Sequence, residues 1–76
     1  MSKTYLFFPL CTVKCKDGLL EVTESKRRYY ADPLKASEAA KAIQRAMLEV
    51  SATIEAKAEI RTIKRTETAL DGEIVE

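Results

Sequence analysis

The amino-acid sequence predicts a small α+β domain with the element order β-β-α-β. Three observations support this: apolar and polar residues alternate over residues 53–63, a segment with helical spacing precedes them, and a strand–turn–strand pattern comes first. Side chains repeat with a period of two in a strand and of about 3.6 in a helix. We therefore expect residues 1–66 to form one domain, in which a single helix packs on one face of a small sheet. We expect residues 67–76 to be an acidic tail, either frayed or folded as a short hairpin.

The first two elements are expected to form a β-hairpin. Residues 3–16 are rich in aromatic and β-branched side chains, and Asp17-Gly18 is typical of a two-residue type I′ turn. A turn at these two residues would place Lys14 opposite Glu21 as a favourable charge pair. Because Pro9 cannot donate a backbone hydrogen bond, we expect it at an edge position or a bulge.

This register assigns the strand residues to two faces. One face is apolar and is expected to contact the helix; its residues are Tyr5, Phe7, Cys11, Val13, Cys15, Leu20, Val22 and Tyr30. The opposite face is polar near the turn but carries Leu6, Phe8 and Leu10 farther from it. A solvated sheet face should be polar, so we expect a partner to cover this apolar patch. The alternative is that residues of the C-terminal segment fold back over it, namely Ala69, Leu70, Ile74 and Val75.

The helix is expected to begin at Asp32-Pro33, with Asp32 as the N-cap and Pro33 at the first helical position. An apolar stripe then follows at spacings of three and four residues. Its members are Ala36, Ala40, Ile43, Met47 and Val50. We expect the helix to end near residues 50–51.

From about Thr53 a strand is favoured over a continuation of the helix. In a helix, like charges would meet four residues apart, as at Glu55 and Glu59, and such pairs are destabilising. In a strand, the four charged residues of this segment share one face and alternate in sign. The alternative is helix continuation, because Ala, Glu and Lys have high helix propensities.

Cys11 and Cys15 are expected on one face of the first strand, with their Cα atoms roughly 13 Å apart, beyond the reach of a disulfide. We therefore expect two reduced cysteines, which are typical of the cytoplasm. The chain has no His, so neither a structural metal nor a cofactor is expected. The longest apolar run, residues 5–11, is too short to span a membrane and is followed by no cleavage site, so we expect no membrane association and no signal peptide.

Residues 25–30, Ser-Lys-Arg-Arg-Tyr-Tyr, are the one cluster with chemistry suited to binding. The cations Lys26, Arg27 and Arg28 beside Tyr29 have the character of a single-stranded nucleic-acid site, where cations bind phosphates and rings stack on bases. An acidic protein partner is a second interpretation. A third is a solvated edge strand whose cations discourage pairing with other strands. The chain as a whole has 13 basic and 12 acidic residues, so no strong field attracts nucleic acid.

Catalysis has little support in the sequence. Without His, a Ser or Cys nucleophile lacks its usual activating base, and two glycines are too few for a Gly-rich phosphate loop. We expect a small non-catalytic protein-binding module, a homodimer or a subunit, that regulates or inhibits a larger assembly. The residues expected to bind the partner are Leu6, Phe8, Leu10, Lys26, Arg27, Arg28 and Tyr29. Size alone is compatible with an accessory protein of a phage or plasmid. The alternative function is nucleic-acid binding through residues 25–30.

Overall fold

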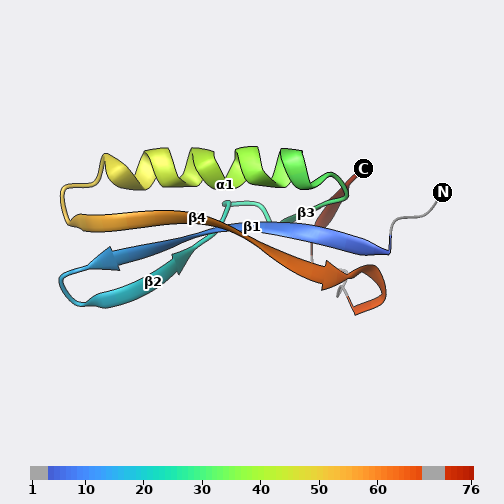
Figure 1. Cartoon of the computed structure of the whole chain (residues 1–76), viewed down its shortest axis with the longest axis horizontal. Coiled ribbons are helices and arrows are strands. Elements are labelled where there is room, and N and C mark those ends of the chain that lie inside the picture. Colours follow the sequence, from blue (N-terminus) through green and yellow to red (C-terminus); the bar gives the residue numbers. More distant parts are fainter. Residues whose placement is uncertain (1–3, 68–71) are drawn as a thin grey trace.

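A long strand, β1 (Tyr5–Cys15), forms the centre of the fold (Figure 1). The computed structural model describes residues 4–67 and 72–76. On one side β1 pairs in antiparallel with β4 (Thr53–Lys64) along its whole length. The helix α1 (Pro33–Leu48) lies across one face of the sheet and packs on both of these strands. The predicted α+β class is therefore confirmed.

Three short strands complete a five-stranded mixed sheet. On its second side β1 pairs with β2 (Gly18–Val22) and with β3 (Arg28–Tyr30). A 3-10 turn, η1 (Arg65–Glu67), follows β4. β5 (Glu73–Val75) then pairs in parallel with β3. Instead of a frayed tail or a short hairpin, the C-terminal segment supplies an edge strand of the sheet.

The hairpin between β1 and β2 turns one residue earlier than the sequence predicts. Cys15 pairs with Gly18, which leaves residues 16–17 in the loop, and the predicted pair of Lys14 with Glu21 is not formed. A type I′ turn at Asp17-Gly18 needs positive φ at both residues, but of the described residues only Gly18 has a positive φ, 130°. The predicted register is therefore wrong by two residues. Because the shift is even, each side chain keeps its predicted face.

Pro9 lies inside the central strand, so the prediction of an edge position or a bulge is wrong. The Arg65 N–H donates to the Thr4 carbonyl oxygen at 2.9 Å, which shows that even-numbered residues of β1 direct their backbone groups toward β4. The backbone groups of the odd-numbered residues, including Pro9, point away from β4, toward the side of β1 where β2 and β3 pair. There the pairs of β1 stop at Phe7 on β3 and resume at Cys11 on β2. The missing N–H of Pro9 falls into this gap and costs no ladder hydrogen bond.

The helix begins as predicted. The Asp32 side chain accepts a hydrogen bond from the Leu34 N–H at 2.9 Å, and Pro33 is the first helical residue. The helix ends at Leu48, two residues before the predicted end, where the Glu49 N–H closes the last turn. Among the residues that the structure describes, no helix is long and apolar enough to cross a membrane. The predicted strand from Thr53 is confirmed as β4.

Most of the buried apolar side chains that the structure describes form two clusters, and the alternation of β1 places these on opposite faces of the sheet. The far-face cluster lies on the side away from α1 and consists of Leu6, Phe8, Leu10, Tyr29 and Ala31, with Ile63 and Ile74 packed against it. The helix-face cluster consists of Cys11, Val13 and Ala56, with Val22, Ile43 and Met47 packed against it. Cys11 and Cys15 lie on one face of β1, as predicted, and both are free thiols. Burial raises the pKa of the Cys11 thiol.

Candidate protein-binding surface

The predicted partner-binding patch is part of the core. Leu6 is 0% exposed, Leu10 2% and Phe8 6%. The ring of Tyr29 packs on the ring of Phe8 with centroids 5.4 Å apart, and isoleucines of β4 and β5 pack on the same cluster. The prediction that this patch lies open to a partner is therefore wrong. Its cover comes from residues that are distant in sequence, whose positions no local pattern indicates.

The alternative cover, by the C-terminal segment, agrees in part with the structure. Ile74 packs against the far-face cluster, and Val75 pairs with Tyr30 of β3. Ala69 and Leu70 lie outside the described residues. The segment after residue 72 is therefore part of the folded domain.

The basic-aromatic segment 25–30 is mostly engaged within the chain. The Arg27 guanidinium carbon lies 5.4 Å from the centroid of the Phe8 ring, and its Nη1 donates to the Tyr29 hydroxyl at 3.3 Å. Tyr29 is 4% exposed, so its ring is not available to stack on a base. Lys26 is exposed in the loop before β3. This arrangement resembles an internal packing element more than a nucleic-acid site.

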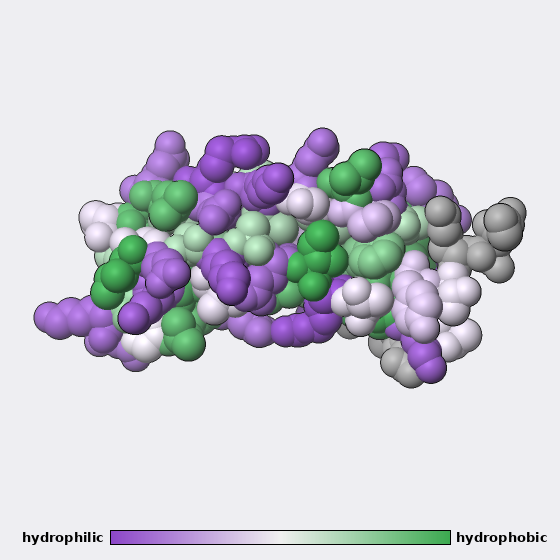
Figure 2. Space-filling view, viewed as in Figure 1, coloured by the Kyte–Doolittle hydropathy of each residue, from purple (hydrophilic) through white to green (hydrophobic). Residues whose placement is uncertain are grey.

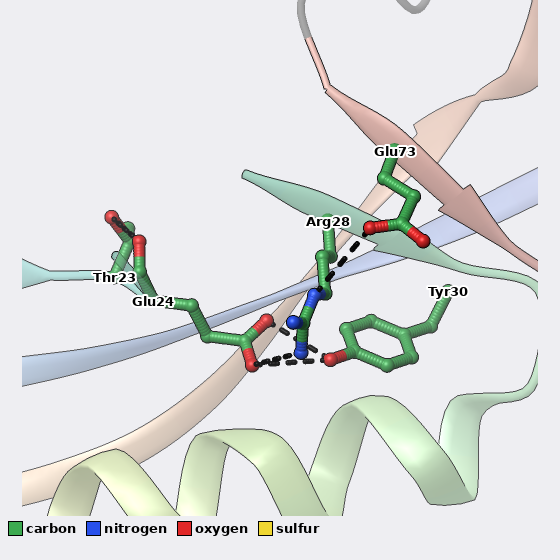
Figure 3. Close-up of polar contacts among 5 residues, drawn as sticks. All are labelled: Thr23, Glu24, Arg28, Tyr30 and Glu73. Carbon is green, nitrogen blue, oxygen red and sulfur yellow. Dashed lines mark hydrogen bonds and ion pairs between the residues drawn. The ribbon is translucent and has the colours of Figure 1, made fainter. Parts of the chain in front are cut away.

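Arg28 belongs to a polar network with Glu24, Tyr30 and Glu73 (Figure 3). The Tyr30 hydroxyl donates to both carboxylate oxygens of Glu24, at 3.0 and 3.1 Å. Arg28 lies 3.7 Å from the Glu24 carboxylate and 3.8 Å from that of Glu73. Burial raises the pKa of Tyr30, which keeps its hydroxyl protonated and able to donate. These contacts connect the loop of residues 23–27 to β3 and β5. The network therefore has a structural role.

The outer edge of β4 is an open sheet edge. Among the strands that the structure describes, β4 pairs only with β1. The hydrogen bond from the Arg65 N–H to the Thr4 carbonyl oxygen shows that odd-numbered residues of this segment direct their backbone groups toward β1. The even-numbered residues therefore direct their N–H and C=O groups outward. Accordingly, Gln44 Nε2 of α1 donates to the outward carbonyl oxygen of Ala56 at 2.8 Å. With 12 residues, β4 is long for an unprotected edge.

Exposed apolar side chains lie along this edge. Leu48 follows Gln44 by one turn of α1 and therefore lies on the side of the helix nearest the β4 edge, whereas Leu34 is turned about 80° away from Gln44 and points farther from the sheet. They are 58% and 73% exposed, and β4 itself exposes Ile54 (65%) and Ile60 (38%). The view in Figure 2 shows apolar side chains of this kind separated by hydrophilic ones, not gathered in one large apolar area.

The far face of β4 carries charges of alternating sign, in the order Glu55, Lys57, Glu59 and Arg61. Arg61 forms a surface ion pair with Glu21 of β2 at 2.9 Å. The other three charges form no ion pair among the described residues. The alternation is visible in the sequence, but the open edge beside it is not, because the strand order depends on contacts between distant segments. Sequence reasoning therefore missed this surface.

Comparison with known proteins finds no matching family model, no matching curated protein and no matching solved structure. Function must therefore be inferred from the surfaces of this chain.

Proposed function

We propose that this chain is a protein-binding module that acts by adding the β4 edge to a strand of a partner. The observation that carries the proposal is the open 12-residue edge, which meets no other strand in the part of the chain that the structure describes. Unpaired N–H and C=O groups of an edge strand are a template for another strand. Strand addition at such an edge is a recurrent mode of protein recognition.

The surroundings of the edge suit this role. Ile60 and Leu48 offer apolar contact on the helix side of the edge, where both are exposed. The charges on the far face provide selection between partners, since like charges brought together across an interface are unfavourable. Binding of this kind needs no catalytic group. A module that occupies a partner's sheet edge would regulate or inhibit the assembly to which that partner belongs.

A proline at position 58 tests the proposal. The N–H of Ala58 points outward, so Ala58→Pro removes an edge donor while the ladder between β1 and β4 keeps its hydrogen bonds. We expect this variant to stay folded by circular dichroism and to lose the partners that the wild-type chain captures from a native lysate. Ala58→Ser, which keeps both the N–H and a small side chain, is the matched control and should retain them. Equal capture by the two variants would contradict the proposal.

The same lysate-capture experiment distinguishes protein binding from nucleic-acid binding. Binding to phosphates weakens steeply as salt rises, because counterions are released. Strand addition with apolar contacts is much less sensitive. We therefore expect capture to survive an increase in salt and a nuclease treatment. Loss of capture in both conditions would favour the nucleic-acid alternative.

A further inference from the structure

We propose that the occupant of the β4 edge is a second copy of this chain, paired in antiparallel across a two-fold axis at Ala58. The inference rests on the proposed function, because it assigns the partner of the same edge. A pair of this kind would join two five-stranded sheets into one continuous sheet. Both helices would then lie on the same face.

Symmetry limits the possible registers. A two-fold axis that relates two antiparallel neighbouring strands is perpendicular to the sheet, so each residue and its symmetry mate lie on the same face. Residues opposed across the pair also share a face. The numbers of two opposed residues therefore add up to an even number, and each register is defined by the residue on the axis.

The charge order of β4 selects one of these registers. With Ala58 on the axis, Glu55 meets the partner's Arg61 and Lys57 meets the partner's Glu59, and symmetry repeats both pairs. An axis at residue 57 or 59 would oppose like charges. An axis at residue 56 or 60 would leave two of the four charges without an opposite charge within β4. Only the Ala58 register pairs all four charges within the strand.

The backbone agrees with this register. Ala58 is even-numbered, so its N–H and C=O point outward, and two copies would exchange both hydrogen bonds across the axis. Ala56 would pair in the same way with the partner's Ile60. Gln44 already donates to the Ala56 carbonyl oxygen, but a carbonyl oxygen has a second lone pair for the partner's N–H. A small residue on the axis leaves the helix side unobstructed.

The spacing of the helices also fits. Because α1 packs on both β1 and β4, it lies above the boundary between them. Neighbouring strands are about 4.8 Å apart, so the two helices of the pair would be about 10 Å apart, close to the usual distance of packed helices. Gln44 lies beside Ala56. Ala58 is about 6.6 Å farther along β4, which corresponds to four or five residues of α1 and places the axis near residue 39 or 40.

This position brings two exposed leucines close to the interface. The midpoint between Leu34 and Leu48 is residue 41, one or two residues from this position, and the two helices run in opposite directions about the axis. Leu34 of one copy would therefore lie within about one helical turn of the level of the partner's Leu48. Both side chains are more than half exposed in the single chain. Self-pairing would cover Leu48 on the edge side of α1 and would also close the longest open edge of the described sheet.

Charge reversal at the edge tests the register. Lys57→Glu and Glu59→Lys each oppose like charges at two symmetric positions, and each should weaken self-association about tenfold or more in sedimentation equilibrium. An equimolar mixture of the two variants restores opposite charges, and we expect a heterodimer of near wild-type affinity. Lys35→Glu is the matched control, because it makes the same charge change nine residues before Gln44, on the opposite side of α1. It should leave self-association unchanged.

Each other outcome overturns a definite part of the proposal. A wild-type chain that stays monomeric excludes the second copy as the occupant; the proposed function would still stand if Ala58→Pro abolished the capture of another protein. A dimer that the mixture of variants fails to restore excludes the Ala58 register. If Ala58→Pro changes neither self-association nor capture, the edge has no binding role and both proposals fail.

Discussion

The two buried clusters of this chain are built in different ways. The far-face cluster combines large side chains from β1 and β3 with isoleucines of β4 and β5. The helix-face cluster has three buried members, two of them the small residues Cys11 and Ala56, and its larger neighbours are only partly buried. The buried residues of α1 itself are alanines. The comparison indicates that apolar side chains are more completely buried on the far face, while several large ones on the helix side keep surface in contact with water.

Truncation of one residue in each cluster is the strongest test of this difference. Phe8→Ala should lower the free energy of unfolding by about 3–5 kcal/mol, because the lost ring also contacts Tyr29 and Arg27. Met47→Ala should cost clearly less, about 2 kcal/mol, because Met47 is only partly buried. Urea denaturation followed by circular dichroism measures both. Equal losses would mean that the two clusters contribute alike.

The same reasoning changes the expectation for a charge at position 8. If Phe8 lay on the partner-binding patch that the sequence predicts, Phe8→Glu would leave the domain folded and disrupt only binding. Since Phe8 is 6% exposed, the new carboxylate would be buried without a partner, at a cost that a small domain cannot bear. We now expect Phe8→Glu to unfold the chain.

The far-face cluster should also depend on how closely β5 approaches β3. A Cβ added at Gly72 would lie 2.8 Å from the Arg27 carbonyl oxygen and 2.9 Å from Cε2 of Tyr29. Backbone cannot yield easily, so Gly72→Ala should displace β5 and cost about 1–3 kcal/mol. In hydrogen exchange, the Ala31 amide, which donates to Val75, should lose protection. The Thr53 amide at the other end of the molecule is the control, and equal loss at both would indicate global destabilisation instead.

A smaller effect is expected from the polar network beside β3. Tyr30→Phe removes the hydrogen bond to Glu24 and should cost about 1 kcal/mol near neutral pH. Burial raises the pKa of Tyr30 in the folded chain, so the neutral hydroxyl is favoured by folding. Its contribution is complete below the unfolded pKa of about 10 and is lost as pH rises through the folded value. The wild-type chain should therefore lose more stability than Tyr30→Phe in alkaline urea titrations; identical slopes would contradict this assignment.

The sequence indicates those elements whose signals are local. Asp32-Pro33 marks the start of α1 because an N-cap and an N1 proline act on adjacent residues. The alternation from Thr53 marks β4 because a strand repeats every two residues. The hairpin is also visible, but its register depends on the φ angle of Asp17, which the residue type alone does not determine.

The remaining features depend on contacts between distant segments. β3 and β5 have three residues each, too few for a pattern. They form through pairing with distant segments, since β3 pairs with both β1 and β5. The apolar character of Leu6 and Phe8 is evident from the sequence, but the identity of their cover is not. In the same way, the charges of β4 can be read directly, whereas the openness of its edge follows only from the strand order.

The central position of β1 has a consequence for the rate of folding. β1 comes first among the strands, yet it pairs over its greatest length with β4. The pair of Tyr5 with Lys64 joins two residues that are separated by most of the described chain. The hairpin of β1 and β2 can form early, because its contacts are local. The other side of β1 stays unpaired until α1 is in place and β4 returns, and such long closures are slow. We therefore expect the joining of β1 and β4 to limit the folding rate, and β1 to be the segment most prone to aggregation until then.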